Sequence, residues 1–117
     1  MTVDAFLNKL KTSPDEIDFN ELMTLLDSHY QFKETAFDNG DLHNKAGENS
    51  GSCKLFSFAQ LHGLNETETL ACFGAYYRED VLQNPESDNH QNIRNFMKTG
   101  WAGVKFHGEA LSGSLSG

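Results

Sequence analysis

The sequence predicts a single compact α+β domain that is dominated by four to five helices and has scope for a small β-sheet. A chain of 117 residues fits one domain, because single domains mostly contain about 100 to 150 residues. Leucine, with 13 copies, outnumbers valine and isoleucine, which total five, and β-branched residues are the ones that favour sheets. Several segments also repeat apolar residues at helical spacing. We therefore expect helices to supply most of the core.

Two helices are predicted within the first 29 residues. The apolar residues at positions 3, 6, 7 and 10 lie on one helical face, with Thr2 as the N-cap. A break at Pro14 follows. Asp18 and Glu21 then have the spacing of a capping box, in front of a broad apolar face that predicts a helix over 19–29.

The next segment is predicted to be extended and to lead into a long loop. Tyr30 and Phe32 alternate with polar residues, and the Asn39-Gly40 pair is the strongest short turn signal of the chain. Residues 38–52 are almost all polar or glycine. A loop of this length in a compact domain is usually functional or disordered.

Two further elements are predicted between Ser50 and Pro85. Ser50 or Ser52 can begin a segment that ends before Gly63, and its residues 52–59 fit a helix or a short strand. A capping box at Asn65 predicts a helix that continues to Val81 and ends before Pro85.

A last helix is expected to begin at Asp88 or Asn89 and to stop at Gly100. Residues 104–106 can pair with the segment at 32–37 as a small sheet. The domain is expected to span 1–111, and the serine- and glycine-rich residues 112–117 are expected to be a disordered tail.

Charge and hydropathy exclude several classes of partner. The formal net charge is −8, so the average electrostatic field repels nucleic acid and anionic membrane surfaces. No apolar run approaches the roughly 20 residues needed to cross a bilayer. The first residues lack the apolar stretch of a secretory signal peptide. We expect a soluble cytoplasmic monomer with no nucleic-acid partner and no membrane insertion.

The two cysteines and five histidines show none of the usual metal-site spacings. Cys53 and Cys72 form no C-x-x-C motif, and the histidines form no H-E-x-x-H motif. The simplest interpretation is two buried free thiols in a reducing compartment. We expect neither a metal nor a cofactor.

The first candidate binding segment is the end of the 38–52 loop and the start of the following helix. Asn49 and Ser52 belong to a stretch that can expose backbone N–H groups, and Lys54 adds a positive charge, so a small anion could bind there. A helix N-terminus and a lysine would also lower the pKa of the Cys53 thiol, as a nucleophile requires. The alternative is an ordinary helix start packed by its own polar side chains.

The second candidate segment carries aromatic and basic residues. Tyr77, Arg78, His90 and Arg94 can line a polar pocket that recognises an anionic group. The two arginines also lie beside acidic residues, so intramolecular ion pairs are the alternative explanation.

Four blocks of the sequence resemble one family closely. "AGENSGSCKLFSFA", "LACFGAYYREDVL", "HQNIRNFMKTGW" and "VKFHGEAL" are similar to the HopJ family of bacterial proteins, named for a type III secretion effector. The resemblance runs from about Tyr30 to Leu111 and implies a small soluble domain that is delivered into host cells. It implies no established activity, cofactor or catalytic residue.

Two hypotheses for the function follow. The first is a non-catalytic module that binds a protein or a small polar ligand through the 38–54 loop and the surface of Arg78, His90 and Arg94. The alternative is a small enzyme that acts on an anionic substrate through Cys53 or a histidine-carboxylate site, assisted by Lys54 or Arg94. The reactivity of the Cys53 thiol distinguishes the two hypotheses.

Overall fold

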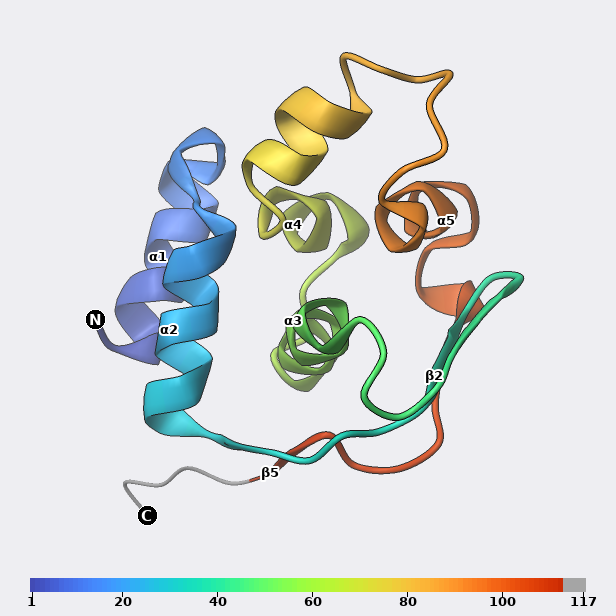
Figure 1. Cartoon of the computed structure of the whole chain (residues 1–117). Helices are drawn as coiled ribbons and strands as arrows, with labels where there is room; N and C mark the ends of the chain where they lie inside the picture. Colours follow the sequence, from blue (N-terminus) through green and yellow to red (C-terminus); the bar gives the residue numbers. More distant parts are fainter. Residues whose placement is uncertain (113–117) are drawn as a thin grey trace.

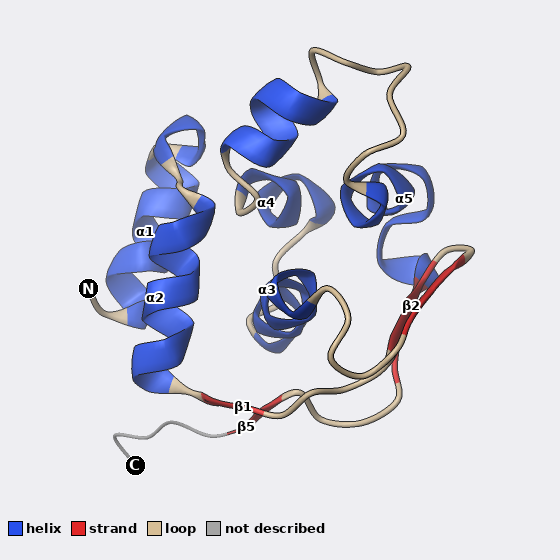
Figure 2. Cartoon of the chain, viewed as in Figure 1, coloured by secondary structure: helices blue, strands red, loops and turns tan. Residues whose placement is uncertain are grey.

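The computed structural model, which describes residues 1–112, contains five α-helices, a π-helical segment and five short strands (Figure 1). The helices gather on one side of the molecule, and the short strands run along the opposite edge (Figure 2). The predicted α+β class with a helical majority is confirmed.

The first two helices begin where their capping residues predict. In α1 (Val3–Thr12) the Thr2 hydroxyl accepts a hydrogen bond of 3.0 Å from the Ala5 N–H. In α2 (Phe19–His29) Asp18 and Glu21 form both halves of the capping box. A 3₁₀ turn, η1 (Pro14–Glu16), joins the two helices. The side chain at each start binds backbone N–H groups that the helix leaves free, which fixes the boundary.

Helix α3 (Ser50–Leu61) decides between the two predictions for residues 52–59, since all of them are helical. The alternation of Phe56 and Phe58 suggested a strand. Both rings are nevertheless buried, because α3 lies between the other helices and the β-sheet (Figure 1). A helix packed on several sides carries apolar residues around most of its circumference.

The predicted single helix from Asn65 to Val81 is wrong, because the structure divides it into two pieces. Helix α4 (Glu66–Ala71) begins at the predicted capping box. The chain then turns at Gly74, whose φ angle is +63°, and continues as a π-helical segment, η2 (Tyr76–Val81). An α-helix cannot pass through a left-handed residue, so the glycine ends α4.

Helix α5 (Gln91–Thr99) begins after His90 rather than after Asp88 or Asn89. Gly100, with φ +59°, ends it as predicted. A 3₁₀ turn, η3 (Gly100–Gly103), then leads into the last strands.

The strands form two small antiparallel sheets. In the first, β2 (Phe37–Asn39) lies between β3 (Leu42–Asn44) and β4 (Val104–Phe106). In the second, β1 (Gln31–Phe32) pairs with β5 (Leu111–Ser112). The predicted small sheet is confirmed.

The predicted loop over 38–52 is wrong for its first half. Residues 37–44 form the β2–β3 hairpin, which turns at Gly40 with φ +61°. The turn signal at Asn39-Gly40 was correct. The flanking Asp, His and Asn residues are poor strand formers, and they adopt the strand because β4 pairs with β2 from the other side.

Strand β5 also bears on the expected tail, because it includes Ser112, which pairs with Gln31. Residues 113–117, the rest of the expected tail, lie outside the described residues.

Candidate binding cavity

A cavity of about 570 Å³ lies where the first turns of α3 and α5 approach α2 and η2. Its lining combines an aromatic wall with the polar ends of two helices. The residues that line it are Phe19, Leu42, Asn49, Gly51, Ser52, Phe73, Tyr76, His90, Gln91, Asn92 and Ile93. A concave, largely apolar space with a few polar groups is the usual form of a small-molecule site.

The aromatic wall is an ordered cluster. The rings of Phe19 and Phe73 stack with centroids 6.1 Å apart, and Tyr76 meets Phe19 edge-on at 5.4 Å. The His90 ring lies 5.3 Å from that of Tyr76. His90 is held by a hydrogen bond of 3.1 Å between its Nε2 and Asp80 Oδ2. The wall therefore offers flat surfaces on which a planar group can stack.

Both helices that open onto the cavity begin at a residue in the left-handed conformation. Asn49 has φ +50° and His90 has φ +53°, and they are the non-glycine residues with positive φ among residues 1–112. No described side chain caps either helix. The first N–H groups of α3 and α5 are therefore available to an acceptor group of a ligand. Backbone strain of this kind is common at ligand sites.

A network of asparagine side chains, buried at Asn39, Asn44 and Asn92 and exposed at Asn49, holds the two helix starts and the hairpin together. Asn92 Oδ1 accepts hydrogen bonds from Nδ2 of Asn39 at 3.0 Å and of Asn44 at 3.2 Å. Asn44 Oδ1 in turn accepts from Asn92 at 3.0 Å and from Asn49 at 2.7 Å. Because these side-chain amides hydrogen-bond to one another, they fix the starts of α3 and α5 relative to strand β3.

The structure brings together three of the residues predicted for a ligand site: Asn49, Ser52 and His90 all line the cavity. Tyr77 does not line it, and its neighbour Tyr76 does. The π-helical turn of η2 decides which of the two rings faces the cavity, and nothing in the local sequence indicates a π-helix.

The other predicted residues make intramolecular contacts. Lys54 Nζ lies 3.2 Å from Asp27 Oδ1 and 5.0 Å from the centre of the Phe32 ring. The Arg78 guanidinium donates to the carbonyl oxygen of Ile17 at 2.9 Å. That contact helps join η2 to the start of α2.

Arg94 is buried and donates from Nε and Nη2 to the carbonyl and side-chain oxygens of Asn89, at 2.6 and 2.8 Å. It also lines a separate groove of about 440 Å³. Within residues 1–112 neither arginine forms an ion pair. The partners are carbonyl and amide oxygens rather than the predicted carboxylates.

Cys53 does not face the cavity. It is 1% exposed, and its Sγ donates to the Thr35 carbonyl oxygen at 3.5 Å. Burial raises the pKa of the Cys53 thiol, and it raises the pKa of Cys72 to about 12. A buried thiol with a raised pKa is a poor nucleophile.

We expect both cysteines to react slowly with a thiol reagent at neutral pH. The thiolate is the reactive form, and the folded protein both buries it and raises its pKa. The reaction should therefore follow transient unfolding, and its rate should rise steeply in denaturant. The measurement is thiol labelling followed by mass spectrometry. Rapid labelling of Cys53 in the native protein below pH 7 would contradict this prediction and support the enzyme hypothesis.

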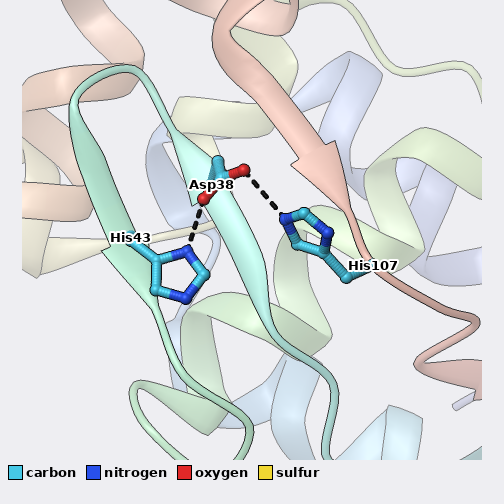
Figure 3. A group of neighbouring side chains, drawn as sticks. All are labelled: Asp38, His43 and His107. Atoms are coloured by element: carbon cyan, nitrogen blue, oxygen red, sulfur yellow. Dashed lines mark hydrogen bonds and ion pairs between the residues drawn. The ribbon is translucent and has the colours of Figure 1, made fainter.

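A second polar cluster lies on the outer face of the three-stranded sheet. Asp38 Oδ1 is 2.6 Å from His43 Nδ1, and Asp38 Oδ2 is 2.8 Å from His107 Nε2 (Figure 3). Hydrogen bonds from His43 first, and then from His107, lower the pKa of the Asp38 carboxyl. No local pattern of the sequence joins Asp38 to His107, because β2, β3 and the residue after β4 each supply one member of the cluster.

The comparisons with known proteins identify the family. The model of the family described as HopJ type III effector protein matches residues 3–111. The chain belongs to the HopJ family. The resemblance predicted from the four sequence blocks is confirmed, and the match extends over the first two helices as well.

The fold of this HopJ family member is also found in a solved structure, described as the crystal structure of the unknown function protein VPA0580. The two share 50% sequence identity with a TM-score of 0.95, over 97% of this chain and 94% of the other. No curated protein matches the sequence. In the described part of this HopJ chain, no helix is both long and apolar enough to cross a membrane.

Proposed function

We propose that the protein is a non-catalytic binding module whose cavity takes a small planar ligand that carries one hydrogen-bond-accepting or carboxylate group. The observation that carries the proposal is the meeting of two uncapped helix starts and an aromatic wall in one cavity of about 570 Å³. The planar part stacks on the wall, and the acceptor group binds the free N–H groups.

The composition of the lining narrows the class of ligand. Among the described residues around the cavity, His90 and Tyr76 are the ionisable side chains, and neither lysine nor arginine takes part. A ligand with several negative charges would find no compensating cation there. One acceptor or carboxylate group matches what two helix N-termini can stabilise.

The alternative function, an enzyme acting on an anionic substrate, has less support. Cys53 is buried, while Lys54 and Arg94 already have intramolecular partners. The cavity contains one histidine, and the carboxylate beside it, Asp80, holds its ring.

The family description supports a place of action. We propose that the module works in the bacterial cytoplasm as a monomer, with delivery into host cells by a type III system as the alternative that the family description suggests. A secretion assay of the tagged full chain, in a strain with an active type III system and in a secretion-deficient control, distinguishes the two. Transport that needs the active system supports delivery.

Amide NMR on the full chain tests the binding proposal. Benzoate at millimolar concentration should shift the amides of residues 49–52 and 90–93, whereas cyclohexanecarboxylate, which cannot stack, should shift them less. Inorganic phosphate should shift them least, because it has no planar part. Absence of shifts at these amides with every aromatic carboxylate of a small panel would overturn the proposal.

Two variants sharpen this test. His90→Asn keeps a residue that tolerates the left-handed conformation and removes the ring, so we expect weaker benzoate binding. His29→Asn removes a histidine outside the cavity and is the matched control. Ser52→Phe is expected to fill the cavity and abolish the shifts. Unchanged binding in both His90→Asn and Ser52→Phe would contradict a site at this position.

A further inference from the structure

We propose that Asp38, His43 and His107 form a binding site for a single divalent transition-metal ion on the outer face of the three-stranded sheet. Each of these residues offers one ligand atom, and the three atoms lie within 4.8 Å of one another. Two imidazoles and one carboxylate are a donor set typical of zinc and of non-haem iron. This site is distinct from the proposed ligand cavity.

The register of the sheet determines which side chains meet. Asp38, in the central strand β2, pairs directly with His43 of β3 and with Lys105 of β4. Side chains of directly paired residues share a face. His107 follows two residues after Lys105 and so lies on the same face. The burial pattern agrees, since Phe37 and Asn39 on either side of Asp38 are buried.

The backbone beneath the three side chains is held in place. The His107 N–H donates to the Ala36 carbonyl oxygen at 3.0 Å, which continues the pairing past the end of β4. The Gly40 N–H donates to the Gly103 carbonyl oxygen at 2.9 Å, which ties the hairpin turn to the segment before β4. On the inner face, Asn39 and Asn44 bind Asn92. The backbone that carries the three proposed ligands is therefore held in place by hydrogen bonds that do not involve a metal ion.

To share one ion, the two imidazoles must move toward each other, because the three ligand atoms now lie within 4.8 Å of one another and an ion holds its ligand atoms closer together. Metal–ligand distances of about 2.0 to 2.2 Å place neighbouring ligand atoms roughly 3 Å apart, close to the 2.6 and 2.8 Å between Asp38 and the two imidazoles. Each neutral imidazole would carry its proton on the ring nitrogen that faces away from Asp38, so that the nitrogen facing the carboxylate offers its lone pair to the ion. Figure 3 shows both rings turned toward the carboxylate from opposite sides.

The surroundings leave part of the coordination sphere to water. The side chains of Asp38, His43 and His107 are 33%, 56% and 44% exposed, so an ion held by three protein ligands would keep at least one open position. Lys105 of β4, which is paired with Asp38 on the strand opposite to that of His43, carries a positive charge. Removing that charge should strengthen binding of a cation.

Calorimetric titration of the full chain with Zn²⁺ tests the proposal. We expect one ion per chain. We expect an affinity at least about tenfold lower in each of Asp38→Asn, His43→Asn and His107→Asn, since even the partners of metal ligands contribute a factor of about ten or more. His29→Asn changes a half-buried histidine at the end of α2, is the matched control and should bind as the original protein does. Lys105→Gln should bind equally well or more tightly.

A second measurement does not depend on variants. Zn²⁺ should shift the imidazole ¹⁵N resonances of Nδ1 in His43 and Nε2 in His107 and leave those of His29 and His62 unchanged. Amide spectra of the variants verify that each one is folded. The proposal is overturned if Zn²⁺ does not bind, if the three ligand variants bind as tightly as the original, or if the imidazole shifts fall on other histidines.

Discussion

Replacing Phe56 with alanine is expected to lower the free energy of unfolding by about 3–5 kcal/mol, the usual cost of removing a buried aromatic ring. Phe56 is 0% exposed and lies at the centre of the aromatic core. Its ring centroid is 5.0 Å from that of Phe96, 5.5 Å from Phe73 and 6.1 Å from Phe37. The ring joins α3 to α5, to the end of α4 and to the sheet, so none of these elements can close the gap alone.

Urea denaturation of Phe56→Ala measures this loss directly. Phe32→Ala is the matched control, because Phe32 packs only at the edge of the core. We expect that control to lose about 1 kcal/mol, as most point variants do. Equal losses in the two variants would contradict the central position of Phe56.

Replacing Gly74 with alanine is expected to lower the free energy of unfolding by about 2–4 kcal/mol. The left-handed conformation, φ +63°, costs an alanine about 1–2 kcal/mol. A Cβ atom there would also lie 2.9 Å from the Phe19 nitrogen and 3.0 Å from the Ile17 carbonyl oxygen. Both are backbone atoms at the start of α2 and cannot turn aside as a side chain could, so further strain of about 1–2 kcal/mol follows.

Gly63 provides a matched control for this variant. Its φ angle is +64°, and an added Cβ atom would meet nothing within 4 Å. Gly63→Ala should therefore show the conformational cost alone, about 1–2 kcal/mol. The difference between the two variants isolates the contact with α2. If Gly74→Ala is no less stable than Gly63→Ala, the close approach of Gly74 to α2 is wrong.

Gly74 also connects stability with the candidate cavity. Its turn separates α4 from η2, and both Phe73 and Tyr76 contact the Phe19 ring. We expect the aromatic wall to be disturbed in Gly74→Ala, so benzoate binding should weaken together with stability. Gly63→Ala should leave benzoate binding unchanged.

The residues of the candidate cavity were predictable where the local sequence restricts the backbone or where the side chain has ionisable chemistry. Asn49 and Ser52 stand out because a glycine- and serine-rich segment precedes an apolar run, the pattern of a helix start. His90 was predicted for its chemistry. Phe19 and Phe73 have the apolar spacing of core residues, and no local signal distinguishes a ring that lines a cavity from one that fills the core.

The amino-acid sequence by itself determined the fold class, the helix starts at Thr2, Asp18 and Asn65, and the family. The helix starts depend on side chains that bind the neighbouring backbone. The fold class and the family depend on residue types and on short sequence blocks, which need no knowledge of distant contacts. The tertiary structure alone decided that β4 turns the polar 38–44 segment into a hairpin. It also decided that two helix starts face one cavity, and that Asp38 meets His107 across 69 residues. The physical reason is that strand pairing and cavity lining depend on contacts between residues distant in sequence, which local propensity does not encode.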